Sequence, residues 1–243
     1  MPSQRAILTY HSLDESGSVI SVRPDVFARQ MAALAASGVR VVRLGELLRT
    51  PGRAVALTFD DGFVNFAEAA APVLARHKFP ATVFLVTDYC GKRNDWPGQW
   101  SSVPRWPLMG WPQIRELSAA GIEFGAHTAT HPDLARLDAA AAAREIEGPK
   151  GRIEDALGRP VESFAYPYGT ATPEVRRMVA QHYRWGCSTR LGYVTVGSPH
   201  EMLERLDVYY LSCGCFFRSL FAGWARGYLG LRGAVRRWRT RRS

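Results

Sequence analysis

Short runs of apolar residues alternate along the chain with longer segments whose apolar positions recur every three to four residues. The short runs are typical of buried strands, and we expect strands at residues 6–10, 39–44, 54–59, 81–86, 122–126, 163–166 and 185–188. The longer segments are typical of amphipathic helices, which we expect at residues 24–36, 63–77, 111–120, 138–157 and 173–182. Strands that alternate with helices in this way predict a parallel α/β sheet or barrel.

Residues with reactive side chains come at the ends of four of these predicted strands. His11 follows the first strand, Asp60 and Asp61 follow the third, His127 follows the fifth, and a Tyr-Pro-Tyr-Gly segment at 166–169 ends the sixth. The carboxyl ends of parallel strands gather at one end of a barrel, where active sites form. We therefore expect these residues to share one site.

His127 and His131 indicate a metal site. Two imidazoles four residues apart, joined by one carboxylate, give three ligands and leave a position open for water, as in catalytic zinc sites. A structural zinc site would need four protein ligands, and the four cysteines include no Cys-x-x-Cys pair. The pattern favours a hydrolytic centre over a structural one.

Three motifs occur in a fixed order: Thr-Phe-Asp-Asp-Gly at 58–62, His-Thr-Ala-Thr-His at 127–131 and Tyr-Pro-Tyr-Gly at 166–169. Together they resemble the motifs of the polysaccharide deacetylase family, also called the NodB homology family or carbohydrate esterase family 4, and the resemblance covers most of residues 5–208. It implies a single domain at 1–210 that folds as a distorted (β/α)7-type barrel. It also implies metal-dependent removal of an acyl group, here the acetyl group of an amino sugar, in cell-surface polysaccharide metabolism.

The resemblance assigns roles to individual residues. Asp61, His127 and His131 would hold a divalent metal ion, for which zinc is our expectation. Asp60 would be the general base that accepts a proton from the attacking water. The chemistry agrees, because a divalent ion lowers the pKa of water and a separate carboxylate can take up the proton.

The third motif supplies the expected oxyanion and substrate contacts. The backbone N–H of Tyr168 would stabilise the oxyanion, a contribution of about 3 to 4 kcal/mol, and Pro167 and Tyr166 would help to bind substrate. In the family this motif commonly begins with an Arg that orients the catalytic Asp. This chain has Ala165 there.

The family's late Leu-x-His motif, which supplies the general acid, has no good match, because His200 lies in a loop-like Gly-Ser-Pro-His-Glu context. His11 is the expected acid instead, since the chain resembles a subgroup that carries this histidine near its N-terminus. Arg205 and Asp207 could replace the missing partner of Asp60. The two departures keep a second hypothesis open, a non-catalytic sugar- or membrane-binding protein on a deacetylase scaffold.

Residues 88–110 form a long segment rich in Gly and Pro that carries Trp96, Trp100 and Trp106. Loops of this length are often functional. The three indole rings could stack on sugar rings or pack over the rim of the barrel, and the sequence does not separate these alternatives.

The composition, with 47% hydrophobic and 22% charged residues, is ordinary for a globular protein. The chain contains no Walker loop, dinucleotide fingerprint or nucleophile elbow. No apolar run approaches the roughly 18 to 20 residues that span a bilayer, and the N-terminus does not resemble a secretory leader. We therefore expect a cytoplasmic enzyme at the inner membrane face, whose amino sugar is linked to a lipid or a nucleotide.

The net charge of +9 is concentrated at the C-terminus. Residues 216–243 contain eight Arg and no acid, whereas the rest of the chain has 23 basic and 22 acidic residues. Apolar residues recur there at helical spacing, at Phe217, Leu220, Phe221, Trp224, Tyr228, Leu231, Val235 and Trp238. We expect residues 211–243 to be a basic amphipathic tail that contacts anionic lipid or docks on the barrel. Nucleic-acid binding is unlikely because the body is nearly neutral.

Overall fold

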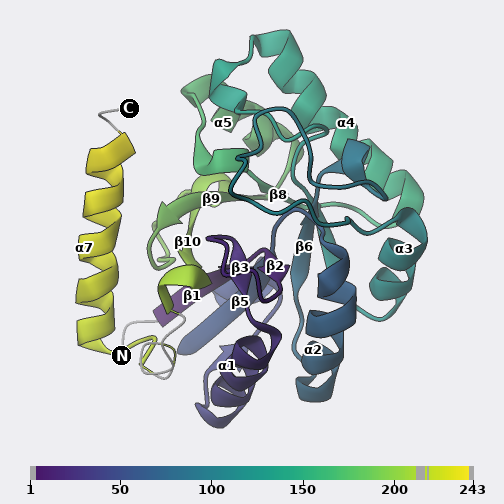
Figure 1. The fold of residues 1–243 in the computed structure, drawn as a ribbon. Helices are drawn as coiled ribbons and strands as arrows, with labels where there is room; N and C mark the ends of the chain where they lie inside the picture. Colours follow the sequence, from purple (N-terminus) through teal and green to yellow (C-terminus); the bar gives the residue numbers. More distant parts are fainter. Residues whose placement is uncertain (1–3, 212–216, 218, 241–243) are drawn as a thin grey trace.

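The computed structural model describes residues 4–211, 217 and 219–240 and contains a barrel of parallel strands surrounded by helices (Figure 1). The strands are β1 Gln4–Tyr10, β2 Ser12–Leu13, β3 Ser21–Val22, β4 Arg40–Val41, β5 Arg53–Phe59, β6 Thr82–Leu85, β7 Glu123–Ala126, β8 Ser163–Ala165, β9 Trp185–Leu191 and β10 Leu203–Asp207. The α-helices are α1 Pro24–Ala36, α2 Ala71–His77, α3 Trp111–Ala119, α4 Ala139–Leu157, α5 Pro173–His182 and α7 Gly223–Thr240. Shorter helical turns are η1 Leu44–Arg49, η2 Phe66–Ala70, η3 Thr87–Tyr89, η4 Leu134–Arg136, η5 Pro167–Gly169, η6 His200–Met202 and η7 Val208–Leu211.

Seven parallel strands close the barrel in the order β1, β10, β9, β8, β7, β6, β5. The closing pair is β1 with β5, in register from Gln4 opposite Arg53 to Tyr10 opposite Phe59. Strand β4 pairs only with the beginning of β5 and stands outside the closed wall. The predicted (β/α)7-type barrel in a single domain is confirmed.

The barrel strands are buried on both faces, which explains why they appear in the sequence as continuous apolar runs. Successive strand residues point to opposite faces. Accordingly Leu8 belongs to the layer shared with the outer helices, while its neighbour Ile7 packs with Ala56 and Phe84 in the barrel interior. The helices thus cover the outside, and the polar residues collect where the strands end.

Capping residues mark the ends of several helices. Thr172 accepts a hydrogen bond from the backbone of Val175 at the start of α5, and Asp138 does the same for Ala141 at the start of α4. Helix α4 ends at Gly158, which adopts a left-handed φ of 63°. The predicted helices therefore match the observed ones closely, apart from a π-helical turn at η2.

The predicted strands differ from the structure at residues 39–44 and at three segments that were not predicted as strands, β2, β3 and β10. In the predicted strand 39–44, only Arg40–Val41 pairs with β5, because the later residues of β5 pair with β6 on the same edge. Residues from Leu44 onward form η1. Strand β10, which carries Arg205, was not predicted as a strand because three of its five residues are charged.

Helix α7 stands along one side of the barrel (Figure 1). Its buried residues include Ala225 and Leu229, whereas Trp224 and Leu231 are exposed. The predicted single stripe is therefore only partly buried, and the side chains of Val235 and Trp238 lie outside the described ones. Among the described residues, no helix combines the length and the apolar character needed to cross a bilayer. The boundary between a domain at 1–210 and a tail at 211–243 stays a prediction.

Candidate active site

The carboxyl ends of the barrel strands surround a cavity of about 400 Å³. His11 follows β1, Asp60 and Asp61 follow β5, and His127 and His131 lie in the loop after β7. All five side chains line this cavity. The structure therefore brings together the residues that the sequence predicted to share one site.

Asp61, His127 and His131 converge in a geometry that suits a metal ion. The Nε2 atoms of His127 and His131 lie 3.5 and 3.6 Å from the same oxygen, Oδ1 of Asp61. These separations are too long for hydrogen bonds, and Oδ1 is buried without a hydrogen-bond partner. Bonds of about 2.1 Å at tetrahedral angles would place two ligand atoms about 3.4 Å apart, so the donor set fits a zinc-like ion.

Hydrogen bonding orients the ligand imidazole of His127. Its Nδ1 lies 2.7 Å from the backbone carbonyl of Ala165, which can only accept, so Nδ1 donates and the Nε2 lone pair points toward Asp61. The alanine that replaces the expected Arg thus contributes its backbone to the site. Outer contacts of this kind hold metal-binding histidines in position.

The second histidine is fixed by an aromatic ring. Trp96 stacks on His131 with ring centroids 4.3 Å apart. Burial and the nearby His127 lower the pKa of His131 well below its usual range, so the imidazole is neutral near pH 7 and its lone pair is available. Burial and the charge of Asp60 raise the pKa of Asp61, although nearby cationic groups oppose this shift.

Glu145 on α4 holds the loop between the two histidines, and the sequence analysis did not identify it. Its carboxylate accepts hydrogen bonds from the backbone N–H groups of Ala129 and Thr130, at 2.8 and 2.9 Å, and from the Thr130 hydroxyl at 2.8 Å. Thr128 adds an internal bond, because its Oγ1 accepts from the N–H of His131 at 2.9 Å. These hydrogen bonds hold the loop in the conformation that presents both imidazoles to Asp61.

Asp60 is paired with Arg205 on β10. Two guanidinium nitrogens donate to the two carboxylate oxygens, each at 2.7 Å, and Nε donates to the backbone carbonyl of Ser188 at 2.8 Å. Burial alone would raise the pKa of Asp60, but the charge of Arg205, aided by His127 and His11, holds it well below its usual range. Arg205 therefore replaces the Arg that the third motif lacks, as the sequence analysis suggested. Its charge keeps Asp60 ionised.

Asp207, the other suggested partner, has a different position. It lines the cavity. Its Oδ1 accepts a hydrogen bond of 3.0 Å from the backbone N–H of Tyr209, at the start of η7. The bidentate contact with Asp60 belongs to Arg205.

His11 lies beside Asp60. Its Nε2 is 3.7 Å from Oδ2 of Asp60, and about a quarter of its side chain is exposed to the cavity. The chain just after it is anchored by Asn65, whose side chain donates to the hydroxyl of Ser12 at 2.7 Å and accepts from the N–H of Leu13 at 3.1 Å. The imidazole thus occupies the same cavity as the three candidate metal ligands.

The third motif forms the short turn η5. Tyr166 is buried and donates its hydroxyl to the backbone carbonyl of Glu201 at 2.7 Å, and Pro167 is also buried. Tyr168 lines the cavity, packs edge-on against His131, and has a positive φ of 57°. The side chains of Tyr166 and Tyr168 both border the cavity, while Pro167 shapes the turn.

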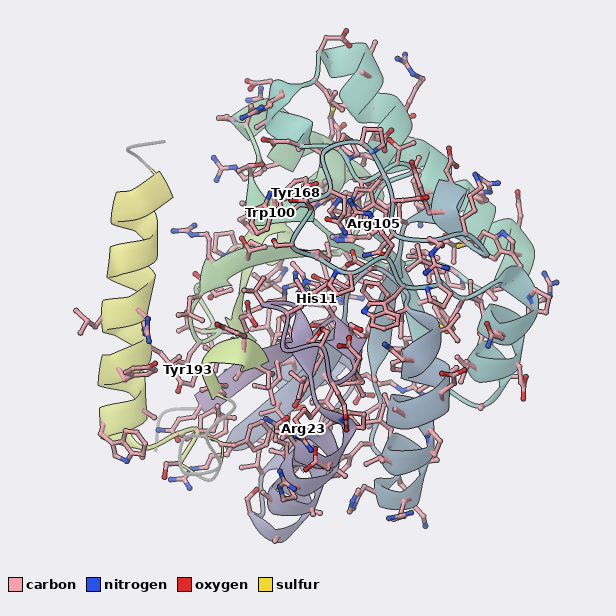
Figure 2. The ribbon with its side chains drawn as sticks, viewed as in Figure 1. His11, Arg23, Trp100, Arg105, Tyr168 and Tyr193 are labelled. Atoms are coloured by element: carbon pink, nitrogen blue, oxygen red, sulfur yellow. The ribbon has the colours of Figure 1, made fainter. Side chains whose placement is uncertain are left out.

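The tryptophans of the long loop divide between the two predicted roles. Trp96 is buried, and Trp106 is half-buried and packs against the small cluster of Phe63 and Leu108. Trp100 is 60% exposed and lines the cavity. Figure 2 shows Trp100 and Tyr168 above His11 in that view. Trp96 also lines the cavity but is 2% exposed and stacked on His131, so Trp100 offers the more accessible ring to a sugar that enters.

Backbone strain is concentrated at this site. Five non-glycine residues in the described part of the chain have positive φ, and four of them, Asp61, Thr128, His131 and Tyr168, lie here. Such conformations cost about 1 to 3 kcal/mol each and persist where surrounding contacts enforce them. The fold thus holds these residues in strained conformations, at a cost in free energy of folding, and this places the side chains at the candidate site.

Comparison with known proteins agrees with this geometry. Residues 48–183 match the family model for polysaccharide deacetylases. The chain is 31% identical to a chitooligosaccharide deacetylase of Bradyrhizobium sp. over 51% of its length, which spans about half (49%) of that relative. It is 24% identical to the poly-beta-1,6-N-acetyl-D-glucosamine N-deacetylase of Staphylococcus epidermidis over 77% of this chain and 68% of the relative. The structure of IcaB from Ammonifex degensii superimposes with a TM-score of 0.72 at 25% identity, covering 93% of this chain and 98% of that one.

Proposed function

Because the chain belongs to the polysaccharide deacetylase family, we propose that it is a metal-dependent hydrolase that removes the acetyl group from the nitrogen of an amino sugar. The observation that carries the proposal is the buried group of Asp61, His127 and His131 beside the ionised Asp60. The identity of the group that carries the sugar, a lipid or a nucleotide, stays a prediction from the sequence.

Asp61, His127 and His131 would hold the ion, and zinc fits their donor atoms. When bound, a divalent ion there would lower the pKa of water and polarise the acyl carbonyl. The two imidazoles are already turned toward Asp61, so the protein supplies a set of ligands that needs little rearrangement.

Asp60 would accept the proton of the attacking water. Its two oxygens are held by Arg205, which fixes the direction of the carboxylate and keeps it charged. Because the carboxylate is buried, solvent screens its charge only weakly. A fixed, ionised carboxylate that lines the cavity can accept a proton from water.

His11 would donate a proton to the leaving nitrogen, and the Tyr168 backbone N–H would stabilise the oxyanion. His11 is exposed to the cavity, and its Nε2 lies 3.7 Å from Oδ2 of Asp60. Since an amine leaves poorly without a proton, a residue at this position is what amide hydrolysis requires. Tyr168 borders the same cavity from η5.

Acetate release from acetylated glucosamine oligomers tests this function. The metal-loaded full chain should release acetate, and a chelator should abolish release until a divalent ion is restored. Asp60→Asn should keep the metal and lose at least about 100-fold in kcat, whereas His127→Ala should lose the metal as well. Asp155→Asn, an exposed change on α4, is the matched control and should behave like the parent.

Two outcomes would contradict the proposal. Full metal-dependent acetate release by both Asp60→Asn and His127→Ala would remove the assigned chemistry. Metal binding by the parent chain without acetate release from any acetylated amino sugar would favour the non-catalytic binder. That alternative rests on the missing Arg and the missing Leu-x-His motif. Arg205 pairs with Asp60, and His11 lies in the same cavity.

A further inference from the structure

Helix α7 is built with two different apolar faces. Ala225 and Leu229 are buried, and the turn before the helix is fastened to the barrel by Tyr193, whose hydroxyl donates to the backbone carbonyl of Leu220 and whose ring packs against Phe221. Figure 2 shows Tyr193 on the side of the barrel that faces α7. The docked face therefore accounts for only part of the apolar pattern of the helix.

The second apolar face is exposed. Trp224 and Leu231 are 51% and 67% exposed, and Tyr228 between them is half-buried. Residues seven apart in a helix point in nearly the same direction, and at about 100° per residue these two point well away from Leu229. Large exposed apolar side chains are uncommon here: only six are found among the described residues, and two of them share this helix face.

The charge of α7 is of one sign. Its sequence contains five Arg and no acid, and three further Arg lie just outside it at 218, 241 and 242. Arg232 is exposed, and its Nε donates to the hydroxyl of Tyr228 at 3.1 Å, which places a cation beside the exposed apolar face. An exposed apolar face on a helix whose charges are all positive complements a surface that is apolar inside and anionic outside.

We propose that the exposed face of α7, which carries Trp224 and Leu231 beside Arg232, docks the protein on the surface of an anionic lipid bilayer. The helix would lie in the plane of the interface, with its aromatic and aliphatic side chains among the acyl chains and its guanidinium groups at the phosphates. The opposite face, with Ala225 and Leu229, stays against the barrel. This inference is independent of the reaction in the cavity.

Vesicle sedimentation with the full chain tests the proposal. The parent protein should bind vesicles that contain phosphatidylglycerol and bind vesicles of pure phosphatidylcholine far more weakly, and added salt should weaken the binding by screening. Trp224→Ser with Leu231→Ser should lower the partition coefficient at least about ten-fold. Replacing Arg232, Arg236 and Arg237 by Gln should lower it by about five-fold per Arg.

Val196→Ser is the matched control, because Val196 is 79% exposed in the loop between β9 and β10 and is remote in sequence from α7. It should bind vesicles like the parent. Unchanged melting temperature and metal content would show that the α7 variants remain folded. Failure of the parent to bind anionic vesicles, or equal binding by the Trp224→Ser/Leu231→Ser variant, would overturn the proposal. Binding to DNA or heparin in place of vesicles, unaffected by the apolar substitutions, would overturn it too and would assign the Arg residues to a soluble polyanion.

Discussion

Arg205 binds both carboxylate oxygens of Asp60 from a position 145 residues later in the chain, through two hydrogen bonds of 2.7 Å. Both side chains are almost completely buried, so each is the compensating charge of the other. Removing one partner of a buried pair leaves an isolated charge, which costs about 3 to 5 kcal/mol. The pair therefore links the stability of the barrel to the chemistry of its cavity.

Arg205→Gln should move the acid limb of the pH profile for kcat/KM to higher pH. Burial raises the pKa of Asp60 and Arg205 opposes this, so loss of the Arg charge raises that pKa. The base must be ionised to accept a proton, and activity is lost as the pH falls through its pKa. We expect a shift of about 1 to 3 pH units. Arg205→Lys, which keeps a charge, should shift less.

A folded Arg205→Gln protein with the parental acid limb would show that Asp60 is not the group that titrates. Circular dichroism and metal content establish that the variant is folded, and the pH profile then separates an electrostatic role of Arg205 from a purely structural one.

His11→Ala should lower kcat for an N-acetyl amino sugar by about 100- to 10,000-fold. The loss should be much smaller for an activated aryl acetate, because a phenolate leaves without needing a proton. Comparing the two substrates measures proton donation directly. Equal losses on amide and ester would indicate that His11 acts by position or binding rather than as an acid. His200→Ala should leave both rates unchanged, since His200 packs on Trp185.

Glu145→Ala should weaken metal affinity by about 10- to 100-fold, because the loop between His127 and His131 loses three hydrogen bonds. A competition titration with a chromogenic chelator measures the change. Glu147→Ala is the control, since Glu147 lies on the same helix as Glu145 and contacts the partly exposed His182 of α5. Parental affinity in Glu145→Ala would show that the loop is held by other contacts.

Gly169→Ala should destabilise the protein more than Gly158→Ala. Both glycines have positive φ, but a Cβ at Gly169 would lie 1.8 Å from Oγ1 of Thr189, whereas nothing lies within 4 Å of one at Gly158. Backbone strain alone costs about 1 to 2 kcal/mol, and the clash adds to it in the turn next to Tyr168. Thermal unfolding measures the difference, and activity should fall only in Gly169→Ala. Equal melting temperatures of the two variants would show that the turn accommodates a Cβ at residue 169 without loss of stability.

Much of this site was visible in the sequence because its residues are local to strand ends. Asp60, Asp61 and His127 follow apolar runs that form β5 and β7 as predicted, and parallel pairing brings such ends together. Arg205 could be suggested as a partner of Asp60 only because the third motif has Ala165 in place of the expected Arg. Its strand was missed, because a charged side chain that points into a barrel has no periodic signature in a five-residue segment.

Other features could not be obtained from the pattern. Glu145 is one of several charged residues on an Ala-rich helix and acquires its role only when α4 packs beside the loop after β7. Similarly, helical spacing grouped the apolar residues of the tail into one stripe, whereas docking of α7 buries Ala225 and Leu229 and leaves Trp224 exposed. Both depend on tertiary packing, which local periodicity does not encode.

Closure of the barrel has a consequence for the order in which the protein matures. Strand β1 pairs with both β5 and β10, so the wall is complete only after the last strand has been synthesised and has returned to the first. Contacts of such long sequence separation form slowly, because the chain entropy of a large loop must be lost first. Until β10 arrives, Asp60 lacks the buried counter-charge of Arg205, although a chain ending before Arg205 already carries all the candidate metal ligands. The last strand thus completes both the barrel wall and the ion pair of Asp60.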